Sequence, residues 1–250
     1  MFLLTPGPPL DDRALEELYD YPSELTAPFV QVNFVSSADG AATVSGRSRG
    51  LSSPADKKVF ALGRDLADVV LVGAGTALAE QYQGVKRTEL RASRRERLGL
   101  SEVPPIAVVT GRGSVPPSSP LITATTVPPI LITSESSPVV WRKEVTAAGA
   151  DVVVAGDERV DAGLALAALA DRGLLRVCCE GGPTLFADMI AAGLVDQLCL
   201  TVAPLLAGAG AVRIADGLPA EDAPMGLTLE SVLADEGFLM LRYRRAAETG

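Results

Sequence analysis

The chain has 250 residues and a formal net charge of −9, and 48% of its residues are hydrophobic. This length allows a substantial buried core, and the negative charge argues against a nucleic-acid partner. The sequence contains no histidine, which excludes serine–histidine–aspartate catalysis and histidine-ligated zinc, so we expect no metal site. Its three cysteines stand in apolar segments, and we find neither a signal peptide nor a membrane-spanning stretch. These features predict a reduced, cytoplasmic, globular protein that does not bind a membrane.

Apolar periodicity and capping residues predict strands and helices that alternate along the chain. A first helix follows Asp11 or Asp12, and a second begins at Ser53. A charged helix over residues 88–100 carries four arginines, which we interpret as a solvated face. Further helices are expected over residues 139–148, residues 162–172 and a segment that starts at residue 183. The expected strands cover residues 29–35, 68–72, 106–110, 130–133, 152–155, 174–179, 197–203, 227–233 and 238–243.

This alternation is typical of an α/β protein whose mostly parallel sheet has helices on both faces. The last two strands are expected to be antiparallel, which makes the sheet mixed. We predict an N-terminal arm and helix over residues 1–27 and a single domain over residues 28–245. Long apolar strands at residues 198–203 and 238–241 suggest an uncovered sheet edge, and such an edge favours pairing with a second copy of the chain.

One predicted strand ends directly in a carboxylate and two glycines. The apolar run at residues 174–179 is followed by Glu180, Gly181 and Gly182, and Pro183 stands where a helix begins. Glycines let the backbone approach a ligand closely, and the free N–H groups of a helix start favour a phosphate. The segment therefore predicts a phosphate-binding turn beside an acidic side chain. A tight turn that simply needs two glycines is the alternative.

A second strand runs into a similar turn. Residues 68–72 are followed by Gly73, Gly75 and Thr76 and then by a helical turn. The spacing of the two glycines resembles the dinucleotide-binding Rossmann motif, but Leu78 occupies the third glycine position and argues against that motif.

Polar residues also follow three other predicted strands. The first strand runs into a turn-prone segment with hydroxyls and Asp39. Thr110-Gly111-Arg112 follows a later strand, and Thr133-Ser134 follows the next one. A hydroxyl with a guanidinium at either place could hold the 2′-phosphate of a nicotinamide cofactor, and a plain polar turn is the alternative.

Six short motifs occur in one order: SADG (37–40), SGRS (45–48), VGAGT (72–76), EGGPT (180–184), VD (195–196) and APLLAG (203–208). This ordered set resembles the reductase domain of the bifunctional riboflavin-biosynthesis deaminase/reductase, over about residues 28–243. The zinc signature of the deaminase half is absent. The resemblance implies a dihydrofolate-reductase-like three-layer sandwich, NADPH as cofactor, and a homodimer.

The resemblance also assigns residues to two ligands. For NADPH it implies Gly50, Thr76, Glu80 and a pyrophosphate cradle over residues 182–188, which includes Gly182, Pro183, Thr184 and Leu185. Together with the strand-end residues Gly73, Thr110 and Gly181 they form the predicted cofactor site. For the substrate it implies Ser48, Gly84, Arg87 and Glu180. Two residues depart from the family pattern, since Glu80 stands where an aspartate is usual and Asn33 where some members have a substrate-side lysine.

The implied reaction reduces 5-amino-6-(5-phosphoribosylamino)uracil, a phosphorylated pyrimidine, to its ribityl form, with the hydride supplied by NADPH. Sugar ring opening needs a proton relay, for which Glu180 and Asp39 are the catalytic candidates. We favour Glu180 as the substrate-orienting carboxylate and Asp39 as a turn residue. Arg87 would pair with the substrate phosphate, or else it is an exposed loop arginine. A dihydrofolate or pterin reductase on the same fold and a non-catalytic NADP-binding protein stay open as alternatives.

Overall fold

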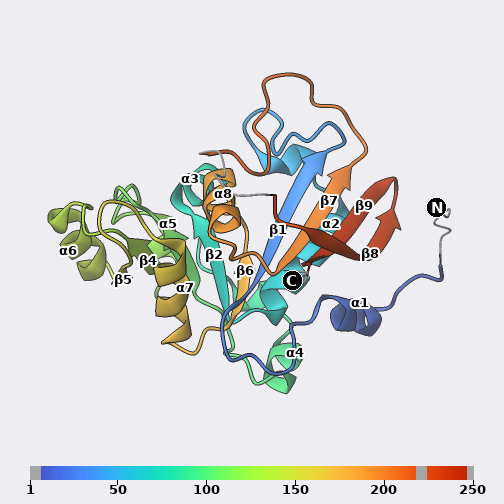
Figure 1. Cartoon of the computed structure of the whole chain (residues 1–250). Helices are drawn as coiled ribbons and strands as arrows, with labels where there is room; N and C mark the ends of the chain where they lie inside the picture. Colours follow the sequence, from blue (N-terminus) through green and yellow to red (C-terminus); the bar gives the residue numbers. More distant parts are fainter. Residues whose placement is uncertain (1–6, 218–223, 247–250) are drawn as a thin grey trace.

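The computed structural model describes residues 7–217 and 224–246, which form a nine-stranded sheet with the order β5-β4-β3-β2-β6-β1-β7-β9-β8 (Figure 1). The first six residues of the predicted N-terminal arm and residues 218–223 of the predicted domain lie outside the described residues. The strands are β1 (Phe29–Ser37), β2 (Val69–Gly73), β3 (Ile106–Val109), β4 (Ile130–Thr133), β5 (Asp151–Val154), β6 (Arg176–Cys179), β7 (Gln197–Ala203), β8 (Leu227–Asp235) and β9 (Phe238–Arg245).

Three helices begin directly after a capping aspartate or serine. Asp11, Ser53 and Asp161 each accept a hydrogen bond from a backbone N–H of the first turn that follows. The helices are α1 (Asp12–Tyr19), α2 (Pro54–Leu66), α3 (Ala74–Ala79), α4 (Ala92–Arg97), α5 (Pro120–Thr123), α6 (Val139–Ala147), α7 (Ala162–Ala170) and α8 (Pro183–Ala191), with single turns η1 (Ser48–Leu51) and η2 (Arg87–Glu89). None of the described helices is long and apolar enough to span a bilayer.

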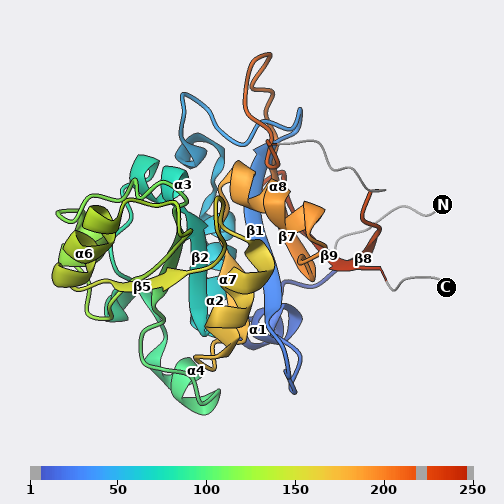
Figure 2. The same ribbon diagram turned by 60° about the vertical axis from the view of Figure 1, so that its left-hand side comes forward.

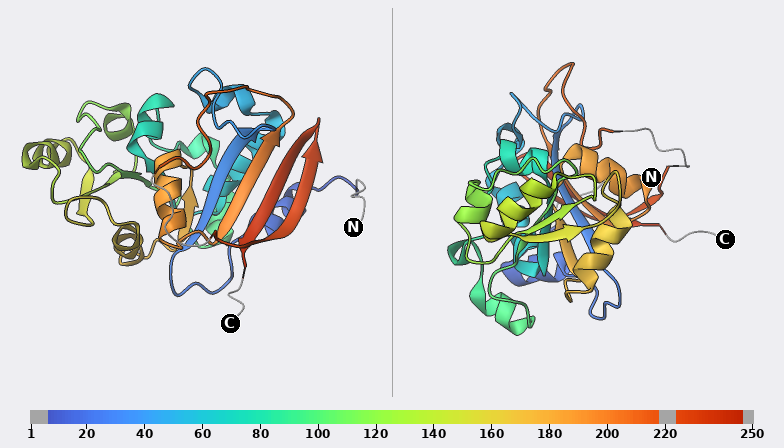
Figure 3. Two further views of the ribbon diagram at one scale, coloured as in Figure 1. Left: turned by 45° about the horizontal axis from the view of Figure 1, so that its top comes forward. Right: turned by 90° about the vertical axis from the view of Figure 1, so that its left-hand side faces the viewer.

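Strand direction confirms the predicted mixed sheet. The pairs from β5 through to β7 are all parallel, and β9 pairs antiparallel with both β7 and β8. The two strands predicted to leave an uncovered edge, β7 and β9, both lie inside the sheet, β7 between β1 and β9 and β9 between β7 and β8, so the placement of that edge is wrong. The edge on this side is β8 (Figure 3, left), where Leu227 and Leu229 are 40% and 48% exposed.

Helices cover both faces of the sheet, as the three-layer prediction requires. Apolar residues of α7 and α8 pack on one face in a cluster that includes Leu71 and Val177 (Figure 2). On the other face α3, α5 and α6 cover one half of the sheet, and α1 and α2 cover the other half. The alternation of side chains along each strand produces this division, because neighbouring residues point to opposite faces.

The arginine-rich segment departs from its prediction as a solvated face. Arg94 and Arg95 of α4 are only 8% and 1% exposed. The Arg94 guanidinium lies between Glu16 of α1 and Asp65 of α2. Arg95 donates to the carbonyl oxygens at the end of α2, which are those of Arg64, Asp65 and Ala67. The arginines are buried because they satisfy carboxylates and helix-end carbonyls that would otherwise lack partners.

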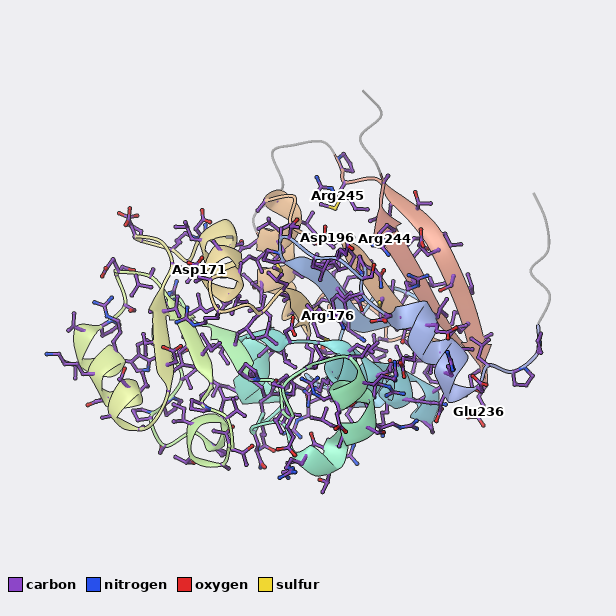
Figure 4. The ribbon with its side chains drawn as sticks, turned by 90° about the horizontal axis from the view of Figure 1, so that it is seen from below. Asp171, Arg176, Asp196, Glu236, Arg244 and Arg245 are labelled. Carbon is purple, nitrogen blue, oxygen red and sulfur yellow. The ribbon has the colours of Figure 1, made fainter. Side chains whose placement is uncertain are left out.

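Asp196, from one of the six motifs, lies at the amino ends of the parallel strands, near Arg244 and Arg245 (Figure 4). Its carboxylate accepts the Val30 N–H at 2.8 Å. Burial raises the pKa of Asp196, against the lowering effects of this hydrogen bond and of the two arginines. The residue therefore fixes the start of β1 and stands apart from the strand ends where the glycines lie.

Candidate active site

A cleft of about 430 Å³ lies between the middle of β1, the helix α2, the loop before α2, and the two turns that follow β2 and β6. Its lining includes predicted site residues from all of these segments except α2: Asn33, Ser48, Thr76, Glu80, Glu180, Gly182 and Pro183. Residues from distant parts of the sequence thus meet at one cavity, as the ordered motifs predict.

The two strand–glycine–helix turns touch each other beneath the cleft. The Gly73 N–H donates to the Gly181 carbonyl oxygen at 2.7 Å, and the Gly181–Gly182 peptide is cis. A Cβ on Gly182 would lie 2.2 Å from Thr76 Oγ1, and one on Gly181 would lie 2.5 Å from the Phe34 ring. Gly181 also has a φ of +83°, which favours glycine. Both positions therefore require glycine, because any larger residue would collide with Thr76 or with Phe34.

The helix α8 starts at this turn with its first N–H groups uncapped by any side chain. Gly182 occupies the N-cap position and Pro183 the first helical position. Thr184 is exposed in the first turn, whereas the side chain of Leu185 packs in the core below. Backbone donors and a positive helix end at a glycine-walled cavity are what a phosphate needs.

Glu180 lies at the floor of the cleft in a buried ion pair with Arg64, a residue that the sequence analysis did not identify. Arg64 Nε and Nη2 donate to the two carboxylate oxygens at 2.6 and 2.7 Å. The Tyr82 hydroxyl donates to the same carboxylate at 2.5 Å. The Glu180 side chain is 1% exposed, so these three donors replace water around its charge.

The surroundings fix the charge state of both partners of Glu180. Burial lowers the pKa of Arg64, but the Glu180 carboxylate outweighs burial and raises that pKa above its ordinary value. Burial and then the nearby Glu180 raise the pKa of Tyr82 well above its usual range. At neutral pH the cleft therefore holds a permanent cation at Arg64 and a protonated hydroxyl at Tyr82.

The position of Arg64 on α2 carried a signal that the sequence analysis passed over. Asp56, Phe60 and Arg64 recur every four residues, which places them on one face of the helix, and all three line the cleft. The Arg64 guanidinium also lies 4.7 Å from the centre of the Phe60 ring. No local pattern joins Arg64 to Glu180, because 116 residues separate them.

Ser48 and Glu80 join the loop before α2 to the end of α3. The backbone N–H and the hydroxyl of Ser48 both donate to Glu80 Oε1, at 2.9 and 3.0 Å. Gly50 lies two residues further on, and a Cβ there would meet the Val44 side chain at 3.2 Å. The predicted cofactor residue Glu80 is thus in direct contact with the predicted substrate residue Ser48.

Nine predicted site residues do not line the cleft. Five of them lie in the loop before α2 or in the two strand–glycine–helix turns: Gly50, Gly73, Gly181, Thr184 and Leu185. The other four lie elsewhere. Arg87 is exposed and forms an ion pair with Glu102. Gly84 is buried against Thr125, and the Thr110 hydroxyl bonds to Ser114. The fourth is Asp39.

The Asp39 carboxylate accepts hydrogen bonds from the Ser37 hydroxyl and from the backbone N–H groups of Ala207 and Gly208. The same three donors, with Ser37 first, lower the pKa of Asp39 to about 2. Asp39 therefore joins two loops and does not line the cleft, which agrees with its interpretation as a turn residue, and a catalytic role for it stays a prediction.

No cluster of three or more cysteine or carboxylate side chains that could hold a metal ion occurs in residues 7–217 and 224–246. The polar groups that line the cleft include the Arg64–Glu180 pair, the Tyr82 hydroxyl, and the carboxylates Glu80 and Asp56.

Comparison of the sequence and the structure with known proteins shows which family the chain belongs to. The family model described as the RibD C-terminal domain matches residues 28–238. A 2,5-diamino-6-ribosylamino-4(3H)-pyrimidinone 5′-phosphate reductase of Archaeoglobus fulgidus is 32% identical over 72% of this chain and 82% of its own length. The protein with the same name in Methanothermobacter thermautotrophicus is 30% identical over 81% and 90%.

Among solved structures, a pyrimidine reductase-like protein of Corynebacterium diphtheriae superimposes with a TM-score of 0.80 and 25% identity, over 88% of this chain and 93% of that one. The fold, the ordered motifs and the family match agree over the same residues. The chain belongs to the RibD C-terminal domain family.

Proposed function

We propose that this protein is an NADPH-dependent reductase that converts a ribosylaminopyrimidine 5′-phosphate to its ribityl form in riboflavin biosynthesis. The observation that carries the proposal is one cleft in which a glycine-walled phosphate cradle meets the buried Arg64–Glu180 pair. The names of the two archaeal relatives support the same reaction.

The cofactor side of the cleft fits NADPH. Gly182 lines the cleft without a side chain, so its backbone can approach a pyrophosphate closely. The uncapped N–H groups of α8 would bind the pyrophosphate, and Thr76 and Glu80 would contact the cofactor from α3 and its end. When bound, the cofactor supplies a hydride, and the protein supplies position and electrostatics.

The substrate side would use the side chains around Glu180. Glu180, held by three donors, orients the sugar through acceptor sites that remain on its oxygens. The fixed charge of Arg64 favours the anionic sugar-phosphate part of the substrate. Tyr82 keeps its proton at neutral pH and uses it to hold the Glu180 carboxylate in place. Arg87 would bind the phosphate once it leaves Glu102.

One experiment separates this proposal from its alternatives. Purified protein is incubated with NADPH and either a ribosylaminopyrimidine phosphate or dihydrofolate, and the loss of NADPH absorbance is followed. We expect turnover with the pyrimidine phosphate only, and tighter binding of NADPH than of NADH by calorimetry. Turnover with dihydrofolate alone would establish a pterin reductase, an alternative that Asn33 keeps open because some family members have a lysine at this position. Binding of NADPH without any turnover would indicate a non-catalytic protein.

We also propose that two copies pair through the edge strand β8, which leaves two leucines about half exposed. An unpaired edge of this kind is a natural template for a two-fold interface. Light scattering at micromolar concentration should give the mass of a dimer, and a monomer mass would refute the proposal. The cytoplasmic location stays a prediction of the sequence.

A further inference from the structure

A second buried carboxylate, Asp56, lines the cleft on α2 and is only 7% exposed. Within the described residues, one side chain donates to it, the Ser52 hydroxyl, which bonds to Oδ2. An ionised carboxylate offers about four acceptor sites, so most of the capacity of Asp56 is unused. Glu180, in contrast, receives three donors. A buried carboxylate with spare acceptor sites favours a ligand that brings its own donors.

The geometry of α2 sets where such a ligand group would lie. Asp56 and Arg64 are eight residues apart on the same helix face, which is about 12 Å at the rise of an α-helix. Phe60 lies between them and lines the cleft as well. A ribosylaminopyrimidine phosphate is an elongated molecule with an anionic end and a planar ring end, so it fits along this face.

The proposed place of the sugar decides the orientation of the substrate. Arg64 is paired with Glu180 and also contacts Glu89 at 3.8 Å, and Glu89 belongs to η2, the turn that carries Arg87. With the sugar at Glu180 and the phosphate directed toward Arg64 and Arg87, the pyrimidine ring extends along α2 toward Asp56, with Phe60 available to contact its face. Lys57 also lines this end but is exposed at the rim, and no ion pair within the described residues joins it to Asp56.

The edge of the pyrimidine can take two forms. A 2-amino-4-oxo ring presents two adjacent donors, the N3–H and the 2-amino group, which match the two oxygens of a carboxylate. A 2,4-dioxo ring presents the N3–H between two carbonyl oxygens. One carboxylate oxygen then accepts a hydrogen bond from the N3–H, and the other faces a carbonyl oxygen that cannot donate. Sites built to accept a hydrogen bond discriminate strongly against an analogue that lacks the donor.

We propose that Asp56 is a specificity-determining residue that selects the 2-amino-4-oxo pyrimidine phosphate over its deaminated 2-oxo counterpart. This inference rests on the proposed reductase function, whose chemistry at the sugar is the same for both substrates. The test compares kcat/KM for the two substrates, measured as NADPH oxidation, in the wild type and in Asp56→Asn. Asparagine keeps the size of the side chain but replaces one acceptor by a donor.

We expect the wild type to prefer the 2-amino substrate by at least about tenfold, and Asp56→Asn to lower this ratio by about tenfold or more. The matched control is Asp65→Asn, because Asp65 is a buried carboxylate of the same helix that does not line the cleft. That control should leave the ratio between the substrates unchanged, whatever it does to stability.

Two results would overturn the inference. One is a wild-type enzyme that shows no preference or favours the 2-oxo substrate, and the other is an Asp56→Asn ratio within about twofold of wild type. If Asp56→Asn does not fold in thermal denaturation, Asp56→Ser removes the same charge and is judged by the same ratio. Wild-type protein that turns over neither pyrimidine overturns the reductase function itself, and the inference fails with it.

Discussion

The two walls of the cleft are built in different ways. The cofactor wall consists of backbone, where two similar strand–glycine–helix turns lie against each other at Gly73 and Gly181. The substrate wall consists of side chains, where Arg64, Tyr82 and Glu180 form one buried network. The cofactor wall depends on closely packed backbone that leaves no room for larger side chains, and the substrate wall depends on paired charges.

This difference predicts that substitutions in the two walls affect binding, turnover and stability in different ways. A side chain added to the cofactor wall displaces the glycine turn but leaves no charge unpaired. Removal of one partner from the substrate wall leaves a buried charge without its counterion, which costs about 3–5 kcal/mol of folding free energy. Substitutions in the two walls should therefore separate loss of binding from loss of turnover and stability.

The largest effect is expected from Gly182→Val. A Cβ at this position would collide with Thr76 Oγ1 at 2.2 Å, so the larger side chain displaces the turn that is proposed to bind the pyrophosphate, together with Thr76. NADPH affinity measured by calorimetry should fall by at least about 100-fold, which is about 2.7 kcal/mol.

The control for this substitution is Gly7→Ala, at a glycine outside the proposed sites where a Cβ would meet no atom within 4 Å. It should bind NADPH normally. If Gly182→Val binds NADPH within about twofold of wild type, this wall does not bind the phosphates of the cofactor.

The next effect concerns Glu180→Gln, which keeps the size of the side chain and removes its charge. Turnover should fall by about 100-fold or more, the usual scale for a group that orients a substrate or supports proton transfer. NADPH affinity should stay near normal, because the residue lies on the other wall. Normal turnover in this variant would make Glu180 a structural residue only.

A double-mutant cycle sharpens this test, because it shows whether the wall acts as a unit. Arg64→Met alone and Glu180→Gln alone each leave one partner of the pair behind. If the two residues act together, the double variant should lose far less in kcat/KM than the product of the single losses. Additive losses would show that Arg64 and Glu180 work separately.

The two walls also differ in how far the sequence could predict them. The turns at Gly73–Thr76 and Gly181–Thr184 each lie within a few consecutive residues, so strand ends, glycines and helix starts were visible in the sequence. The Arg64–Glu180–Tyr82 network joins residues 98 and 116 positions apart, and the pairing depends on which strands become neighbours. The burial of Arg94 and Arg95 was missed for the same reason, since their partners lie on α1 and α2.

A moderate effect is expected from Arg87→Ala. If Arg87 binds the substrate phosphate, its loss removes a charge-assisted contact, so KM for the pyrimidine phosphate should rise by about tenfold or more while NADPH binding is unchanged. Glu102→Gln is the matched control, because it frees Arg87 from its ion pair and should leave KM unchanged or lower it. An unchanged KM in Arg87→Ala would leave Arg64 as the cation for the phosphate.

The smallest effect is expected from Asp39→Asn, outside both walls. Its carboxylate bonds to Ser37, Ala207 and Gly208 and does not line the cleft, so turnover at neutral pH should stay within about threefold of wild type. A large loss of turnover with normal NADPH affinity would show that Asp39 takes part in catalysis.

The stability of Asp39→Asn supplies an independent measurement. The pKa of Asp39 is about 2 in the folded protein, below the ordinary value of 3.8, so its contribution is present above pH 3.8 and is lost as the pH falls toward 2. Urea denaturation should therefore show wild type more stable than Asp39→Asn at pH 6, and the difference should shrink as the pH is lowered from about 4 toward about 2. A difference that is constant over this range would show that the asparagine disturbs the loops through its shape and not through its charge.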